Sequence, residues 1–142
     1  MEASVVRLVQ SSFRKAAGLG EQVAVIFYRE LFEIDPSLRP MFKGPMREQG
    51  KKLLATLAFV IQNLHAPDKV VGPAQDLGRK HVSYGVKARH YTLVGNALLR
   101  TLAKGLGDDF TPEVRAAWVS AYKLLADVMR EAAYGSNWRQ AA

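Results

Sequence analysis

The chain has 142 residues, of which 49% are of hydrophobic type, and its 20 Lys and Arg against 13 Asp and Glu leave a formal net charge of +7 at pH 7. This is the length of one ordinary domain with one core. The absence of cysteine excludes disulfide scaffolds, thiolate metal sites and thiol catalysis, and it permits the reducing cytoplasm, where we expect the protein. Residues 1–10 lack the apolar core of a signal peptide, and no apolar run approaches the ~20 residues of a membrane-spanning helix, so we expect no membrane insertion.

Apolar residues recur at spacings of three and four, which is typical of helices, and strand-like alternation is absent. In chain order, the spacing predicts helices to about residue 18 and over 21–33, a short turn at 36–41, and helices over 46–64, 73–83, 90–106 and 112–134. The predicted fold class is therefore all-α, with one domain over 1–134. Residues 135–142 contain Gly, Ser, Asn and Gln, and we expect them to form a frayed tail.

Prolines mark the expected helix starts, because proline is tolerated in the first turn of a helix but disrupts its interior. Four pairs place a residue that can cap a helix before a proline, namely Asp35-Pro36, Gly44-Pro45, Gly72-Pro73 and Thr111-Pro112. Each pair predicts a helix start. Pro67 is expected in a turn, so no proline should interrupt a long helix.

The polar residues form none of the common catalytic motifs. The histidines, His65, His81 and His90, lack the H-E-x-x-H spacing, and no nucleophile elbow, phosphate loop or dinucleotide fingerprint occurs. His81 follows Ala74 and Leu77 at helical spacing, which places its imidazole on an apolar helix face. Spacing alone leaves two interpretations open, a core histidine and a ligand of a metal or haem.

Four segments in order carry a resemblance to a known family. They are FYRELF at 27–32, DPSLRPMF at 35–42, LGRKHVSYGV at 77–86 followed by HYTLVG at 90–95, and AWVSAY at 117–122. Together they resemble the single-domain bacterial globins, and in particular the haem domain of flavohaemoglobins. The resemblance covers nearly all of residues 1–134 and implies a globin fold, with about six main helices and a short third helix enclosing a haem.

On the proximal side, the resemblance implies that His81 binds the iron of a non-covalent haem b. Phe42 is then the aromatic residue that packs against the ring, Val86 and Val94 belong to its apolar wall, and Tyr91 lies beside the proximal histidine. Haem iron with one histidine ligand keeps its opposite face available for a diatomic gas.

On the distal side, the resemblance places Tyr28, Gln49 and Leu53 at the ligand. Gln49 and Leu53 are four residues apart and share a helix face. Bound oxygen takes up negative charge, so a tyrosine hydroxyl and a glutamine amide would retain it, while Leu53 excludes water. Lys52 is a candidate partner of a haem propionate by its location alone.

One position departs from the flavohaemoglobin pattern. The family has a glutamate near the end of the last helix that joins the tyrosine matching Tyr91 in a proximal hydrogen-bond network. Here that position is Ala133, and Glu131 lies two residues earlier, about 200° away around a helix. The electron push of that network is therefore in doubt, and the alternative is that a backbone carbonyl orients His81.

Two haem functions follow from the resemblance. The first is reversible binding of oxygen, or of NO or CO, for storage, delivery or sensing. The second is a nitric oxide dioxygenase that converts NO and O2 to nitrate. Because the 142 residues contain no flavin or nicotinamide domain, such an enzyme would need a separate reductase.

A third function belongs to another class, a haem-free helical module that binds nucleic acid or a membrane through its net charge of +7. The basic residues are scattered, without helix-turn-helix spacing or interleaved aromatic residues, so we expect no nucleic-acid partner. We expect a monomer or a weak dimer through the last two helices.

Overall fold

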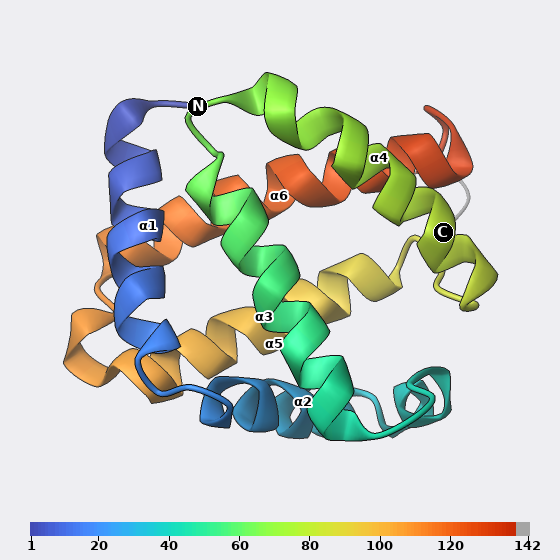
Figure 1. Ribbon diagram of the computed structural model, residues 1–142, viewed down its shortest axis with the longest axis horizontal. Helices are drawn as coiled ribbons and strands as arrows, with labels where there is room; N and C mark the ends of the chain where they lie inside the picture. The colour runs from blue at the N-terminus through green and yellow to red at the C-terminus, as the bar shows by residue number, and fades with distance from the viewer. Residues whose placement is uncertain (139–142) are drawn as a thin grey trace.

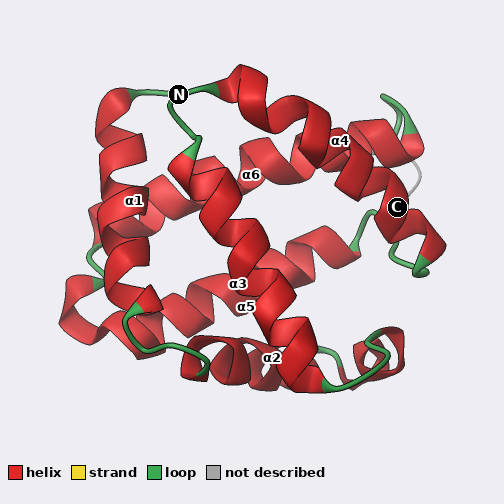
Figure 2. Cartoon of the chain, in the orientation of Figure 1, coloured by secondary structure: helices red, strands yellow, loops and turns green. Residues whose placement is uncertain are grey.

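The computed structural model of the protein describes residues 1–138, which form helices joined by short loops and contain no strand (Figures 1 and 2). The helices are α1 (Ala3–Ala17), α2 (Gln22–Ile34), η1 (Pro36–Met41), α3 (Met46–Gln62), α4 (Pro67–Ser83), α5 (His90–Leu106), η2 (Gly107–Asp109) and α6 (Pro112–Tyr134). The all-α prediction and the predicted order of helices are confirmed. Of the expected tail, residues 135–138 follow α6 as a turn, and residues 139–142 lie outside the described residues.

The helices pack in crossing pairs. α4 lies on α6, α2 on α5 and α1 on α6, while α3 packs against α1 and α2. In Figure 1, α3 crosses in front of α5 and α6, and α4 runs along the upper right of the molecule. A small cluster of Ala74, Tyr91, Ala126 and Met129 joins α4 to α5 and α6. The helix that carries His81 is therefore attached mainly through α6. No helix of the described residues is both long and apolar enough to cross a membrane.

Side-chain caps are observed at two of the predicted helix starts. The Asp35 carboxylate accepts a hydrogen bond from the Ser37 N–H at 3.0 Å before η1. The Thr111 hydroxyl accepts one from the Val114 N–H at 3.2 Å before α6. Each bond satisfies a backbone donor that the first turn of a helix leaves free.

The helix start predicted at Gly72-Pro73 is wrong. α4 begins at Pro67, and Pro73 lies inside it. Pro67 suits the first turn, and Val70, Ala74 and Leu77 continue one apolar face that packs in the small cluster with α6. This packing outweighs the hydrogen bond that Pro73 cannot donate.

Two glycines allow helices to cross at short distance. A Cβ on Gly78 of α4 would lie 2.5 Å from the carbonyl oxygen of Met129 on α6. A Cβ on Gly50 of α3 would lie 2.8 Å from the Cβ of Ala24 on α2. Both distances are too short for nonbonded atoms, so a larger residue would push the helices apart. Gly78 thus sets how closely α4 approaches α6, three residues before His81.

Candidate functional site

His81 has the properties of a ligand with one free ring nitrogen. Its side chain is half-buried near the end of α4, and its Nδ1 lies 2.7 Å from the carbonyl oxygen of Leu77. Because a carbonyl can only accept, Nδ1 carries the proton and Nε2 keeps its lone pair. Burial lowers the pKa of His81 and so favours the neutral ring. The structure therefore has the backbone-carbonyl arrangement that was the alternative to a glutamate.

Four apolar side chains that were predicted to line the haem site are not fully covered by protein atoms. α3 packs on α1 and α2, and α4 packs on α6. Phe42, Leu53 and Val94 pack against the main core, and Val86 packs against the small cluster, yet all four stay only partly buried. A large flat apolar group would complete their burial. A neutral imidazole with a free lone pair, together with these partly exposed apolar side chains, fits a haem.

Tyr28 on α2 lies against the aromatic side chains around Phe42. Its ring centroid is 5.2 Å from that of Phe42, edge to face, and 6.0 Å from that of Phe32, stacked. Burial raises the pKa of Tyr28 to about 12, so the hydroxyl remains protonated and can donate. It makes no hydrogen bond within residues 1–138. Tyr28 and Phe42, both predicted site residues, are therefore brought together.

A cavity of about 630 Å³ opens between α2 and α3. Tyr28, Gly50 and Leu54 are among its lining residues, whereas His81 is not. Tyr28 therefore borders this cavity and also contacts the Phe42 ring.

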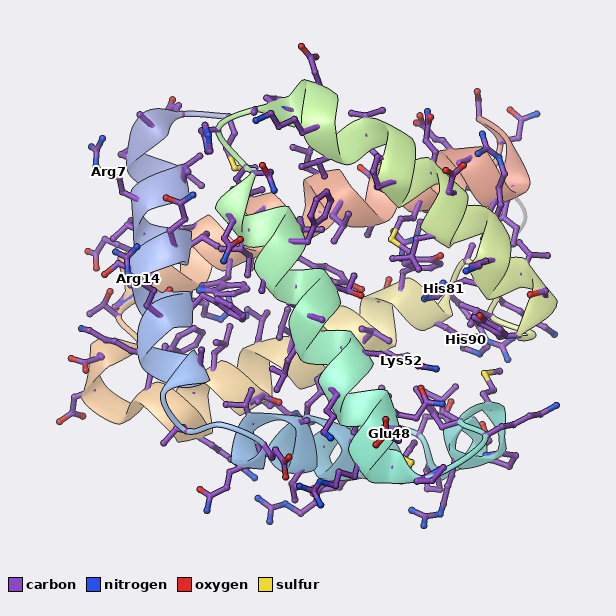
Figure 3. The ribbon with its side chains drawn as sticks, in the orientation of Figure 1. Arg7, Arg14, Glu48, Lys52, His81 and His90 are labelled. Atoms are coloured by element: carbon purple, nitrogen blue, oxygen red, sulfur yellow. The ribbon has the colours of Figure 1, made fainter. Side chains whose placement is uncertain are left out.

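Gln49 and Lys52 both lie on α3, but their side chains differ: that of Gln49 is hydrogen-bonded to a neighbouring loop, and that of Lys52 is exposed. The Gln49 amide donates to the carbonyl oxygen of Lys43 at 2.6 Å, so the loop before α3 engages its NH2 group. Lys52 is exposed, and in Figure 3 it projects from α3 toward the side of the molecule where His81 and His90 are labelled. The structure therefore gives Gln49 a loop-fixing contact that the sequence did not predict.

Tyr91 lies beside His81, and its hydroxyl has no hydrogen-bond partner among residues 1–138. The ring centroids of His81 and Tyr91 are 6.3 Å apart with an interplanar angle of 29°. Tyr91 is 5% exposed, and its hydroxyl is buried without a hydrogen bond within residues 1–138. Burial raises the pKa of Tyr91 to about 12. Ala133, half-buried, offers no acceptor to it, and Glu131 is exposed.

Sequence reasoning missed Arg130, whose guanidinium lies over the Tyr91 ring. Its Nε donates to the carbonyl oxygen of Ala88 at 3.1 Å and a terminal nitrogen donates to the Thr92 hydroxyl at 2.9 Å. Its guanidinium carbon lies 5.3 Å from the centre of the Tyr91 ring. The available signal was a basic residue next to Met129 on the apolar face of the last helix.

Two further tyrosines fix the backbone around this site. The Tyr122 hydroxyl donates to the carbonyl oxygen of Tyr91 at 2.5 Å, and the Tyr134 hydroxyl donates to that of Val86. Burial raises the pKa of both phenols, so they remain donors. Two hydrogen bonds from α6 therefore fix the backbone of the loop between α4 and α5 and of the first turn of α5.

Comparison with known proteins gives consistent matches. Residues 25–129 match the globin family. Flavohemoproteins of Rhizobium meliloti and Deinococcus radiodurans are 30% and 34% identical over 125 and 113 residues, or 86% and 78% of this chain. The chain spans only 31% and 28% of these two relatives.

Two solved structures are similar to this chain in fold. A bacterial globin from Campylobacter jejuni has a TM-score of 0.76 at 25% identity, covering 88% of this chain and 91% of its own. An engineered carbene transferase from Rhodothermus marinus, described as a candidate nitric oxide dioxygenase, has a TM-score of 0.81 at 25% identity, covering 99% of this chain and 95% of its own.

Proposed function

From the premise that this chain belongs to the globin family, whose members bind haem, we propose that it binds oxygen or a related diatomic gas reversibly, with His81 as the iron ligand. The haem supplies the coordination position for the gas. The observation that carries the proposal is the His81 ring, whose Nδ1 is held by the Leu77 carbonyl at 2.7 Å while Nε2 remains free.

On the distal side, we assign retention of the gas chiefly to Tyr28. Its raised pKa keeps the hydroxyl protonated, and no residue among 1–138 takes its proton. Gln49 acts as a second donor only when its amide leaves the Lys43 carbonyl. Leu53, half-buried on the same face of α3, limits the entry of water.

On the proximal side, we assign the apolar wall to Phe42, Val86 and Val94, which a haem would cover. Lys52 is exposed and free to pair with a propionate. Storage, delivery and sensing are the physiological roles that such binding would serve, and we further propose a cytoplasmic location and a monomer or weak dimer.

The test is haem binding by the purified chain. We expect the wild type to show the spectrum of iron ligated by one histidine when deoxygenated. His81→Ala should lose this spectrum and bind haem at least tenfold more weakly. His65→Ala removes an exposed histidine and should change neither. A His81→Ala protein with the wild-type spectrum and affinity would show that another residue binds the iron.

A nitric oxide dioxygenase working with a separate reductase is the second candidate. The similarity to flavohemoproteins and to the Rhodothermus marinus protein favours it. Against it, the helix position of the flavohaemoglobin glutamate is Ala133 here, and a buried cation, Arg130, lies over the Tyr91 ring. Stopped-flow mixing of the oxygenated protein with NO, with and without a reductant, separates the two functions: repeated turnover with the reductant indicates the enzyme, and none indicates a carrier.

A further inference from the structure

We propose that Arg130 is a positioning residue that favours the reduced state of the haem by holding a buried positive charge against the Tyr91 ring. The inference rests on the proposed function, because it concerns the iron that His81 would bind. The Tyr91 ring contacts both groups: its centroid lies 6.3 Å from that of the His81 ring and 5.3 Å from the Arg130 guanidinium carbon.

The guanidinium is fixed in this position by neighbours on several elements. Arg130 is 9% exposed. It donates to the Ala88 carbonyl at 3.1 Å and to the Thr92 hydroxyl at 2.9 Å, and the Trp138 ring centre lies 4.4 Å from its guanidinium carbon. Contacts from the loop after α4, from α5 and from the segment after α6 therefore leave the charge little freedom to turn away.

Among the described residues, the carboxylate paired with Arg130 is that of Asp127, and it neutralises Arg130 only in part. An Asp127 oxygen lies 3.7 Å from an Arg130 nitrogen, and the Asp127 side chain is 23% exposed against 10% for Arg130. The more exposed charge is screened better by water. The partners of Arg130 in the loop and on α5 are neutral, so we infer that its charge leaves a net positive field at the Tyr91 ring, which in turn contacts the His81 ring.

The sign of the effect follows from charge alone. Ferric haem carries one positive charge more than ferrous haem, so a nearby fixed cation disfavours oxidation. His81 adds nothing that offsets it, because Nδ1 donates to the neutral Leu77 carbonyl rather than to a carboxylate. Arg130 thus supports the ferrous state that binds oxygen and slows the loss of that state by oxidation.

The experiment measures the midpoint potential of the haem-loaded full chain by spectroelectrochemistry, with the iron–histidine stretch read by resonance Raman. R130Q should raise the ferric-to-ferrous ratio at a fixed potential by about fivefold to tenfold, where tenfold corresponds to 59 mV for one electron. R130K keeps the charge and should stay within about twofold of wild type. R115Q removes an exposed arginine of the same helix and should leave the potential unchanged.

A wild-type potential in folded R130Q overturns the inference, and so does an equal shift in R130Q and R130K, which would indicate lost hydrogen bonds rather than lost charge. Should R130Q fail to fold, D127N decides: removing the partly offsetting carboxylate must raise the potential, and an unchanged or lowered value overturns the inference. A wild-type protein without an iron–histidine stretch would refute the proposed function, and this inference with it.

Discussion

The Tyr28 hydroxyl is a protonated donor without a partner among residues 1–138, held by contacts with Phe42 and Phe32. If it donates to the bound gas, Tyr28→Phe should speed oxygen dissociation about five- to hundredfold, since such a hydrogen bond contributes about 1–3 kcal/mol. Stopped-flow displacement of oxygen by CO measures the rate. Tyr84→Phe is the matched control, because Tyr84 is 56% exposed. An unchanged rate in Tyr28→Phe would mean that the hydroxyl does not reach the gas.

We expect His90 to make the stability of the protein depend on pH. It is 4% exposed, and its Nδ1 accepts the Lys87 N–H at 2.9 Å. Burial, followed by the charge of Arg89, lowers the pKa of His90 below its ordinary value of 6.5. The unfolded chain then binds the proton more readily, so the stabilisation is present above about pH 6.5 and is lost as the pH falls below it.

Urea unfolding at pH 7 and pH 5 tests this pH dependence. His90→Asn should be less stable at pH 7 and should lose less of its free energy of unfolding on going to pH 5 than the wild type. His65→Gln, which changes an exposed histidine, should retain the wild-type dependence. Equal losses in wild type and His90→Asn would exclude His90 as the titrating group.

Single residues also mark where sequence reasoning reached its limit. The spacing of His81 predicted an inward imidazole, which is half-buried in the structure, because helical periodicity fixes the direction of a side chain. It did not predict that the Gln49 amide would bond to Lys43, or that Arg130 would lie over Tyr91. Both contacts join segments whose distance depends on how helices pack, which spacing within one helix does not specify.

At the scale of elements, Gly78 determines how α4 sits on α6. Gly78→Ala would place a Cβ 2.5 Å from the Met129 carbonyl oxygen, which should destabilise the protein by about 1–3 kcal/mol and weaken haem binding, because His81 moves with α4. Gly72→Ala is the matched control on the same helix, with nothing within 4 Å of its Cβ, and should stabilise by about 0.5–1 kcal/mol. Urea unfolding and haem titration measure both variants, and equal effects would contradict the close crossing.

The helix boundaries followed from the sequence wherever a local hydrogen bond or the end of an apolar face fixes them. Thr111 and Asp35 cap their helices as expected. The start of α4 was predicted six residues late because Pro73 was taken as a first-turn proline. Packing of Val70, Ala74 and Leu77 in the cluster shared with α6 decides that boundary, and this is a tertiary effect that proline statistics do not contain.

At the scale of the whole molecule, the helices form two unequally attached parts. The large cluster joins α1, α2, α3, α5 and α6, and a buried hydrogen bond of 2.8 Å from the Trp118 indole to the Ser12 hydroxyl ties α6 to α1. α4 is attached through the small cluster on α6. Val70 of α4 also packs against the large cluster, and a haem bound by His81 would add a second link between α4 and the apolar side chains of α3.

Haem removal should therefore destabilise the protein unevenly. With free haem at a thousand times its dissociation constant, the holoprotein should exceed the apoprotein by about 4 kcal/mol in free energy of unfolding. Hydrogen exchange should show the loss of protection concentrated in Pro67–Ser83 of α4, while Ala3–Ala17 of α1 stays protected through its contact with α6. His81→Ala with the same haem should resemble the apoprotein. Uniform loss of protection along the chain would contradict this division, because it would mean that α4 unfolds only together with the large cluster.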